Sequence, residues 1–156
     1  MRRRNRDRGF TLIELLIVIT IILIISVVAI VNYKKAQMHA NEMSAVRSVQ
    51  TIYGAEVLYS SNHPDLGYSL DLASLGGSTQ GGGEQDIDAN LASGRKSGYT
   101  FTYTPGEKVN GAIRSFTVTG VPDQVGTTGQ WRLYIDEGGT VHYSASGPAD
   151  ASSPTL

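Results

Sequence analysis

An unbroken run of 19 uncharged residues near the N-terminus constrains this chain more than any other feature. The run extends from Leu15 to Tyr33 and reads LLIVITIILIISVVAIVNY. At 1.5 Å per residue a helix of this length covers about 28 Å, close to the roughly 30 Å hydrocarbon layer of a bilayer. The sequence therefore predicts a membrane-spanning helix.

Charges on the two sides of this run predict its orientation. Residues 1–9 hold five of the chain's arginines, at positions 2, 3, 4, 6 and 8, and a long polar segment follows the run. The positive-inside rule places residues 1–9 in the cytoplasm and the remainder across the membrane. No A-x-A site follows the apolar run, so the usual secretory cut is not expected.

The residues at the front of the run carry a specific resemblance. After the short basic leader the chain reads Gly9-Phe10-Thr11-Leu12-Ile13-Glu14, and GFTLIELLIVI resembles the class III signal of type IV prepilins and pseudopilins. The resemblance implies cleavage between Gly9 and Phe10 by a prepilin peptidase on the cytoplasmic side. It also implies N-methylation of the new Phe10 amine by the same enzyme.

Cleavage would change both the anchoring and the charge of the chain. Gly9 has no side chain, so a protease can approach the adjacent backbone closely. The leader takes five of the 13 Lys and Arg and one of the 14 Asp and Glu. Eight basic residues then stand against 13 acidic ones, a net charge of −5 before the new amine is counted. An acidic surface disfavours contacts with phosphate, so no nucleic acid is expected as a partner.

Glu14 is an unusual residue for a membrane span, because a charged side chain there costs about 2–3 kcal/mol and is usually paired. One reading leaves it hydrated at the level of the lipid headgroups. The resemblance instead implies that it meets the Phe10 amine of a neighbouring subunit. Two such charges about 4 Å apart attract by about 4 kcal/mol at an effective dielectric constant near 20, before desolvation is subtracted. We hypothesise that Glu14 aligns each incoming subunit with the previous one.

One position departs from the pattern of many type IV pilins. The segment Ala29-Ile30-Val31-Asn32-Tyr33 has Val31 where a proline is typical. Proline would kink the helix or interrupt its hydrogen bonds. A bend or melted segment that proline supports in relatives is therefore not carried over to this chain.

Beyond Tyr33 the chain becomes amphipathic, which predicts one continuous helix from about Phe10 to about Ser61. Apolar residues recur at spacings of three and four, at positions 36, 40, 43, 46, 49, 53 and 57, with 45, 52 and 59 beside them. Most polar residues are expected on the other face, Glu42 and Glu56 among them. Gly54 could permit a close backbone contact or be a tolerated defect.

Residues 63–97 are predicted to form a connecting loop with one short helix or turn within 68–75, because glycine and small polar clusters dominate there.

From residue 98 onward apolar and polar residues alternate, which predicts four strands of an antiparallel meander around residues 99–104, 116–119, 131–135 and 141–143. Asp136-Glu137-Gly138-Gly139 is typical of a hairpin turn. The tail, 145–156, is expected to be irregular. The chain has no cysteine, so the C-terminal disulfide of many related pilins is replaced, in this interpretation, by the hairpin at 136–140 and by packing between subunits.

Together these patterns predict an α+β chain, a long N-terminal α-helix packed on a roughly four-stranded antiparallel sheet, as in the pilin fold. The expected segments are a cleaved leader, a transmembrane and assembly half of the helix, an amphipathic half, a connecting loop, the sheet and a tail. Their bounds are 1–9, 10–33, 34–62, 63–97, 98–144 and 145–156.

Patterns for catalysis and cofactors are weak. His39, His63 and His142 lack a second ligand at metal spacing, and Gly81-Gly82-Gly83 lacks the residues of a phosphate-binding loop. Asp86-x-Asp88-x-Asn90 begins like a calcium loop, but Leu91 and Ser97 stand where an EF-hand needs Gly and Glu. A different calcium site remains open at this stage, as in some pseudopilins. We therefore expect no enzyme, no cofactor and no metal site.

The resulting prediction is a structural subunit of a type IV pilus-like filament for surface attachment or motility. Its expected partners are further copies of itself in a helical filament, the prepilin peptidase and N-methyltransferase, and an inner-membrane assembly platform. It would wait in the inner membrane as a single-pass protein with its N-terminus in the cytoplasm, and become extracellular after assembly. The alternatives are a type II secretion pseudopilin, a minor pilin that acts as an adhesin and would need a large groove or a basic patch, and, least favoured, a tethered enzyme.

Overall fold

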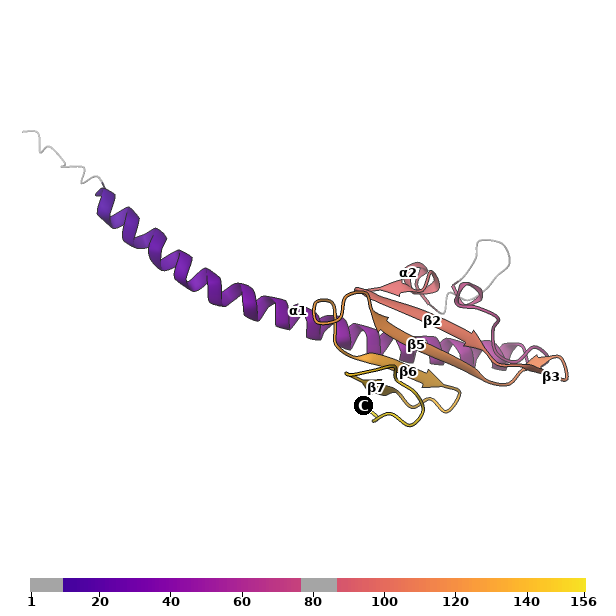
Figure 1. Ribbon diagram of the computed structural model, residues 1–156. Coiled ribbons are helices and arrows are strands. Elements are labelled where there is room, and N and C mark those ends of the chain that lie inside the picture. Colours follow the sequence, from indigo (N-terminus) through magenta and orange to yellow (C-terminus); the bar gives the residue numbers. More distant parts are fainter. Residues whose placement is uncertain (1–9, 77–86) are drawn as a thin grey trace, which may run out of the picture. The chain divides into compact units, whose positions relative to one another are not determined.

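One long helix, α1 (Leu12–Asn62), takes part in two separate units of the chain (Figure 1). The computed structural model describes residues 10–76 and 87–156. One unit ends at Ala36, and the other, called here the globular unit, comprises Gln37–Leu156. The continuous helix predicted from Phe10 to Ser61 is confirmed to within two residues at its start and one at its end. Its backbone stays helical through position 31, where no proline interrupts the hydrogen-bond ladder.

The sheet of the globular unit is an antiparallel meander in which every neighbouring pair of strands runs in opposite directions. Its order is β1 (Arg95–Lys96), β2 (Tyr99–Pro105), β5 (Phe116–Pro122), β6 (Arg132–Asp136) and β7 (His142–Ser144). The four predicted strands are confirmed as β2, β5, β6 and β7. Thr102 pairs with Thr119 and Thr119 with Tyr134, so their registers align across the sheet.

Three additional strands are too short to show alternation in the sequence. The edge strand β1 has two residues, as do β3 (Lys108–Val109) and β4 (Ala112–Ile113), which form a separate hairpin between β2 and β5. Asn110 and Gly111, at the tip of that hairpin, both have positive φ, at 53° and 88°. Asn-Gly is the preferred pair for such a tight turn, so this hairpin had a readable signal.

The hydrophobic core lies between residues 37–62 of α1 and one face of the sheet. Ala45, Val49 and Ile52 supply the helix side, and alternate residues of the strands supply the other. The strand residues are Tyr99, Phe101, Phe116, Val118, Leu133 and Ile135. The sequence predicted that apolar residues two positions apart in each strand face the same side of the sheet, and the alternating burial along β2, β5 and β6 confirms this.

The predicted apolar stripe of the helix is displaced around its axis. Ala40 and Val57 are exposed, whereas Glu42 and Glu56, predicted on the polar face, are buried. The prediction was wrong because both carboxylates find hydrogen-bond donors on the packed side. Glu42 accepts from the Gln130 amide at 2.8 Å, and Glu56 from the loop that follows α1.

The C-terminal tail is held differently from the expectation. Its backbone pairs with β7: the Tyr143 amide donates to the Pro154 carbonyl at 2.9 Å, and the Leu156 amide to the Val141 carbonyl at 3.1 Å. Nδ1 of His142 lies 2.7 Å from the Ser153 carbonyl. The tail thus follows the sheet edge instead of relying on the hairpin at 136–140, although that hairpin does form, with the Gly139 amide donating to the Asp136 carbonyl at 3.0 Å.

Outside residues 77–86, which the structure does not describe, the loop between α1 and the sheet contains two short helical segments. The first, η1 (Leu72–Ser74), lies within the predicted 68–75 and is capped by Asp71; the second is α2 (Ala89–Ala92). A Cβ placed on Gly54 would meet nothing within 4 Å. Of the two interpretations of this glycine, the close backbone contact is therefore wrong within the part of the chain described.

Candidate functional site

In the N-terminal half of α1, residues 12–36, the large apolar side chains that the structure describes are exposed. Across the large hydrophobic side chains described from 10 to 33, exposure ranges from 48% for Ile19 to 88% for Phe10. By length and composition α1 can cross a membrane, and none of its most apolar window is buried. This surface requires lipid or another protein to remove it from water.

The hydroxyl side chains of Thr20 and Ser26, within this apolar segment, donate to the backbone of the helix itself. The Thr20 hydroxyl donates to the Leu16 carbonyl at 2.7 Å, and the Ser26 hydroxyl to the Ile22 carbonyl at 2.6 Å. Such bonds to the residue four positions earlier let a hydroxyl enter an apolar environment without an unpaired donor. The segment can therefore face hydrocarbon or another helix with little penalty from these two groups.

Glu14 and Thr11 close the front of α1 with a capping box. Oε2 of Glu14 accepts from the Thr11 amide at 2.8 Å and from the Thr11 hydroxyl at 2.7 Å. The Glu14 amide donates back to Oγ1 of Thr11 at 3.3 Å. Threonine followed three residues later by glutamate is the typical sequence for this arrangement, because each side chain satisfies a backbone group of the other.

The second carboxylate oxygen of Glu14 accepts no hydrogen bond from the residues that the structure describes. Both hydrogen bonds that the Glu14 carboxylate accepts end on Oε2. An ionised carboxylate can accept several donors, so Oε1 retains its capacity for an external one. The sequence analysis missed the cap, although Thr11-Leu12-Ile13-Glu14 contains its signal.

Of the two predicted processing residues, Gly9 and Phe10, the structure describes Phe10. Gly9 lies outside the described residues, as does the leader. Phe10 lies two residues before the start of α1 at Leu12 and is 88% exposed. Within one chain, the structure brings Glu14 together with Thr11 and not with an amine.

Each of the three histidines has contacts within the globular unit. These are His39 with Glu42 at 3.5 Å and edge-on to Trp131, His63 stacked on Tyr59, and His142 with Ser153. Among residues 10–76 and 87–156, no group of three or more His, Asp or Glu is placed to hold a metal ion.

Asp88 takes a structural role in the described part of the suspected calcium loop. It caps α2, accepting from the Asn90 and Leu91 amides at 3.1 Å, and it pairs with Lys96 at 2.7 Å. The hydrogen bond from Lys96 is the main reason that the pKa of Asp88 lies below its usual value. Asp86 and Gly81-Gly82-Gly83 lie outside the described residues.

Glu56 is the most unusual carboxylate of the globular unit because it is fully buried without a cation. Oε2 accepts from the Ser69 amide at 2.9 Å, and Oε1 accepts from the Ser69 hydroxyl. The Tyr103 hydroxyl donates to the Ser69 carbonyl at 2.9 Å and completes the network. Burial raises the pKa of Glu56, although the bonds from Ser69 oppose the shift. The network fixes the start of the loop to α1.

Comparisons with known proteins concentrate on the N-terminus. Residues 4–30 match the model of the prokaryotic N-terminal methylation motif. Over 55 residues the chain is 42% identical to the type IV major pilin protein PilA of Myxococcus xanthus (strain DK1622). The aligned stretch covers 35% of this chain and only 25% of that protein. No solved structure gives a significant match.

The residues that match the motif overlap the N-terminal half of α1, whose apolar side chains are exposed. The globular unit contains the antiparallel sheet that the sequence predicted after this helix. Together, the methylation motif and the aligned stretch make the N-terminal part of the chain similar to that of a type IV major pilin, and the α+β architecture is compatible with this similarity.

Proposed function

We propose that this protein is a structural subunit of a type IV pilus-like filament, polymerised through the N-terminal half of α1. One observation carries the proposal: apolar side chains that stay exposed along a helix headed by the methylation motif. Before assembly the helix would span the inner membrane with the leader in the cytoplasm. A prepilin peptidase would cut after Gly9 and methylate the amine of Phe10.

Assembly would replace lipid around this helix by helices of other subunits. Lipid is as apolar as leucine, so packing and specific polar contacts must favour the filament over the membrane. Subunits that meet head-to-tail without closing a ring form a helical filament. An inner-membrane platform would add the subunits, and the filament would serve attachment or motility rather than catalysis.

Glu14 would supply the polar contact that sets the register. Its Oε1 accepts nothing within the described chain, so it can receive the Phe10 amine of a neighbouring subunit while Oε2 keeps the cap. The two roles can be separated by substitution. Glutamine retains a hydrogen-bonding side chain in the capping box but removes the charge.

The filament itself can be tested on cells that express the chain. Filaments sheared from the surface are imaged, and their main component is sequenced by mass spectrometry. We expect this chain, beginning with a methylated Phe10. Gly9→Val should remain uncut and membrane-bound. Expression without long surface filaments would overturn the proposal and favour the secretion pseudopilin.

The role of Glu14 requires three variants. Glu14→Gln should be cut normally but yield at least about tenfold fewer filaments, as expected for loss of an attraction of more than about 1.4 kcal/mol. Thr11→Ala removes the cap and keeps the charge, so it should still assemble. Glu14→Ala removes both the capping carboxylate and the charge, so it should be cut normally and assemble poorly, as Glu14→Gln should. Normal filament yield from Glu14→Gln would refute the register role.

A further inference from the structure

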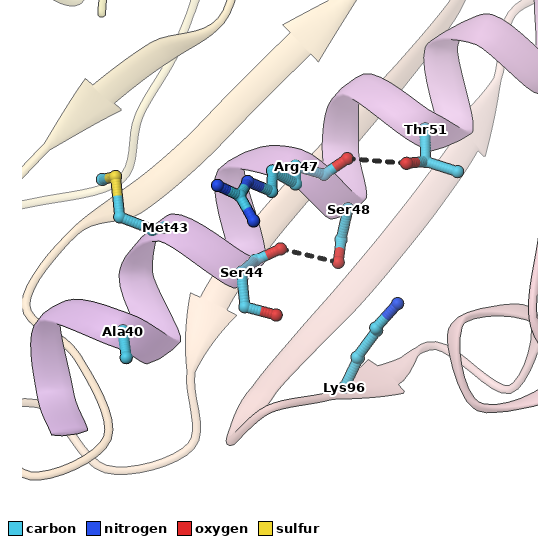
Figure 2. Close-up of a pocket in the computed structure, with 7 residues that line it drawn as sticks. All are labelled: Ala40, Met43, Ser44, Arg47, Ser48, Thr51 and Lys96. Carbon is cyan, nitrogen blue, oxygen red and sulfur yellow. Dashed lines mark hydrogen bonds between the residues drawn. The ribbon is translucent and has the colours of Figure 1, made fainter.

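A polar groove of about 450 Å³ lies on the globular unit, between α1 and the sheet edge at β1 (Figure 2). Its lining combines two cations, Arg47 of α1 and Lys96 of β1, with hydroxyl side chains. In Figure 2 the Ser44 and Ser48 side chains lie between α1 and Lys96. Arg47 and Lys96 are far apart in the sequence, so no pattern in the sequence revealed the groove.

Arg47 is the main free donor that this groove offers among the described residues, because Lys96 is already paired with Asp88. The Ser48 and Thr51 hydroxyls donate to α1 carbonyls at 2.8 Å, and Ser44 is paired with Ser97 at 2.8 Å. Arg47 forms no ion pair within the described residues, and Lys96 has one, with Asp88. A guanidinium presents several N–H donors in a planar fork that matches a carboxylate. The groove therefore favours a carboxylate as its occupant.

A matching carboxylate lies near the opposite edge of the same sheet. Asp136, the last residue of β6, and Glu137, which follows it, are called here the acidic turn; the turn leads to the edge strand β7. Asp136 is committed to the turn, accepting from the Gly138 amide at 2.9 Å. Glu137 is exposed and has no hydrogen bond or ion pair within the described chain. The nearest cation along β6 is Arg132, at its start.

The groove and the acidic turn of one molecule cannot meet. The groove lies at β1 and the acidic turn begins at the end of β6, and the three strand spacings between them are about 14 Å. A contact between them must join two molecules. It would use different surfaces of the two partners, and such a contact propagates along a chain of subunits instead of closing a dimer.

We infer that the groove at Arg47 and Lys96 binds the acidic turn of a second copy of this chain, with Glu137 facing Arg47. The contact rests on the proposed filament, because adjacent subunits there are held at high local concentration, which lets a weak surface contact form. Its role is to fix how neighbouring globular units face each other. The apolar helices still supply most of the attraction.

Disulfide trapping tests the contact in the full chain, which lacks cysteine. Thr51→Cys lies in the groove and Thr140→Cys beside the acidic turn, and together they leave every charge in place. Mild oxidation of cells should give a ladder of crosslinked multimers, with none from either single variant. The matched control combines Thr51→Cys with Lys108→Cys on the separate hairpin and should give no ladder.

Charge reversal provides a second, independent measurement. Arg47→Glu and Glu137→Arg should each lower the yield of sheared filaments by about fivefold or more, because like charges then face each other. The double variant restores opposite charges and should recover to within about twofold of wild type. Glu107→Arg, an exposed carboxylate on another surface, serves as the control and should assemble normally.

The outcomes separate this inference from the proposed function. A ladder, or recovery in the swapped double variant, supports the contact. Wild-type filaments together with no ladder and normal assembly of both single reversals would overturn the contact and leave the filament proposal intact. Absence of filaments from the wild type would overturn both.

Discussion

The two parts of α1 differ in what covers them. In the globular unit, Val49 and Ile52 are fully buried, and the carboxylate of Glu56 is enclosed as well. In the N-terminal half, Ile17 and Ile22 are about half exposed although they are just as apolar. Propensity for helix is similar in both parts. The globular unit therefore buries its apolar helix face within one chain, whereas the apolar side chains of the N-terminal half can be buried only by lipid or by another protein.

Polar groups follow the same division. The N-terminal half satisfies its hydroxyls and its cap by contacts within one or two turns, as Thr20 and Glu14 do. The globular unit satisfies Glu42 and Glu56 by residues distant in sequence or in the next loop. No buried polar side-chain atom lacks a partner in the part of the chain described. Hydrogen bonds within one or two turns stay in place when the surroundings of a helix change, because no contact with a distant part of the chain has to break.

The largest expected effect comes from truncating isoleucine in each part. Ile52→Ala should lower the free energy of unfolding of the globular unit by about 2–5 kcal/mol, since it leaves a cavity in the core. Ile22→Ala should leave that value unchanged. Thermal unfolding of the detergent-solubilised chain, followed by near-ultraviolet circular dichroism, measures both. An equal loss from both variants would contradict the division between the two parts.

Glu56 gives the next effect. Glu56→Ala should cost about 2–3 kcal/mol, because it leaves the buried Ser69 amide without an acceptor, whereas the Ser69 hydroxyl can still donate to the Asp71 carbonyl at 3.0 Å. Glu14→Ala, its counterpart in the N-terminal half, should not change unfolding of the globular unit. Chemical denaturation of the three proteins at neutral pH measures the difference.

The raised pKa of Glu56 adds a pH dependence. An acid whose pKa is raised by folding stabilises the fold fully below its unfolded value, ordinarily 4.5, and that contribution is lost as pH rises through the folded value. Glu56→Gln carries no charge and should flatten this slope. Unfolding midpoints of wild type and Glu56→Gln between pH 4 and 8 provide the measurement; parallel profiles would contradict the assignment.

Removal of the docked tail should have a smaller effect. Deleting residues 153–156 removes the three hydrogen bonds to Val141, His142 and Tyr143 and should cost about 1.5 kcal/mol in total, at about 0.5 kcal/mol for each. Thr155→Ala keeps the backbone bonds and should be neutral. Hydrogen exchange at the Tyr143 amide should rise only in the deletion. Unchanged exchange there would show that the tail does not protect β7.

The smallest effect is expected at the front of α1. Thr11→Ala should destabilise the first turn by about 1 kcal/mol or less, through loss of the cap. Faster amide exchange at residues 12–15, with no change in the melting of the globular unit, would locate the effect. A lowered melting temperature would mean that the two parts are coupled.

How far the sequence predicts this structure depends on the distance over which each signal acts. The long helix, the four main strands and the turn at Asp136 follow from periodicity and turn residues close together in the chain. Burial of Glu42 and Glu56 could not be predicted, because their donors belong to Gln130 and Ser69. A carboxylate at a helical position gives no sign of which backbone group will meet it.

The candidate site follows the same rule. Gly9, Phe10 and Glu14 were singled out by a local motif, and the capping box also had a local signal in Thr11 that was overlooked. The groove could not be predicted, since Arg47 and Lys96 line one groove only when α1 packs beside β1. The docked tail was missed because its pairing with β7 has no side-chain pattern.

The docking of the tail on β7 bears on how the subunit matures. A C-terminal segment closed by a disulfide has to wait for an oxidant, and it opens again wherever thiols are abundant. Here the closure consists of backbone hydrogen bonds from Tyr143 and Leu156 and a histidine contact to Ser153. The segment can close as soon as the sheet forms, with no redox enzyme in its folding pathway, and thiol reductants have no bond in it to attack.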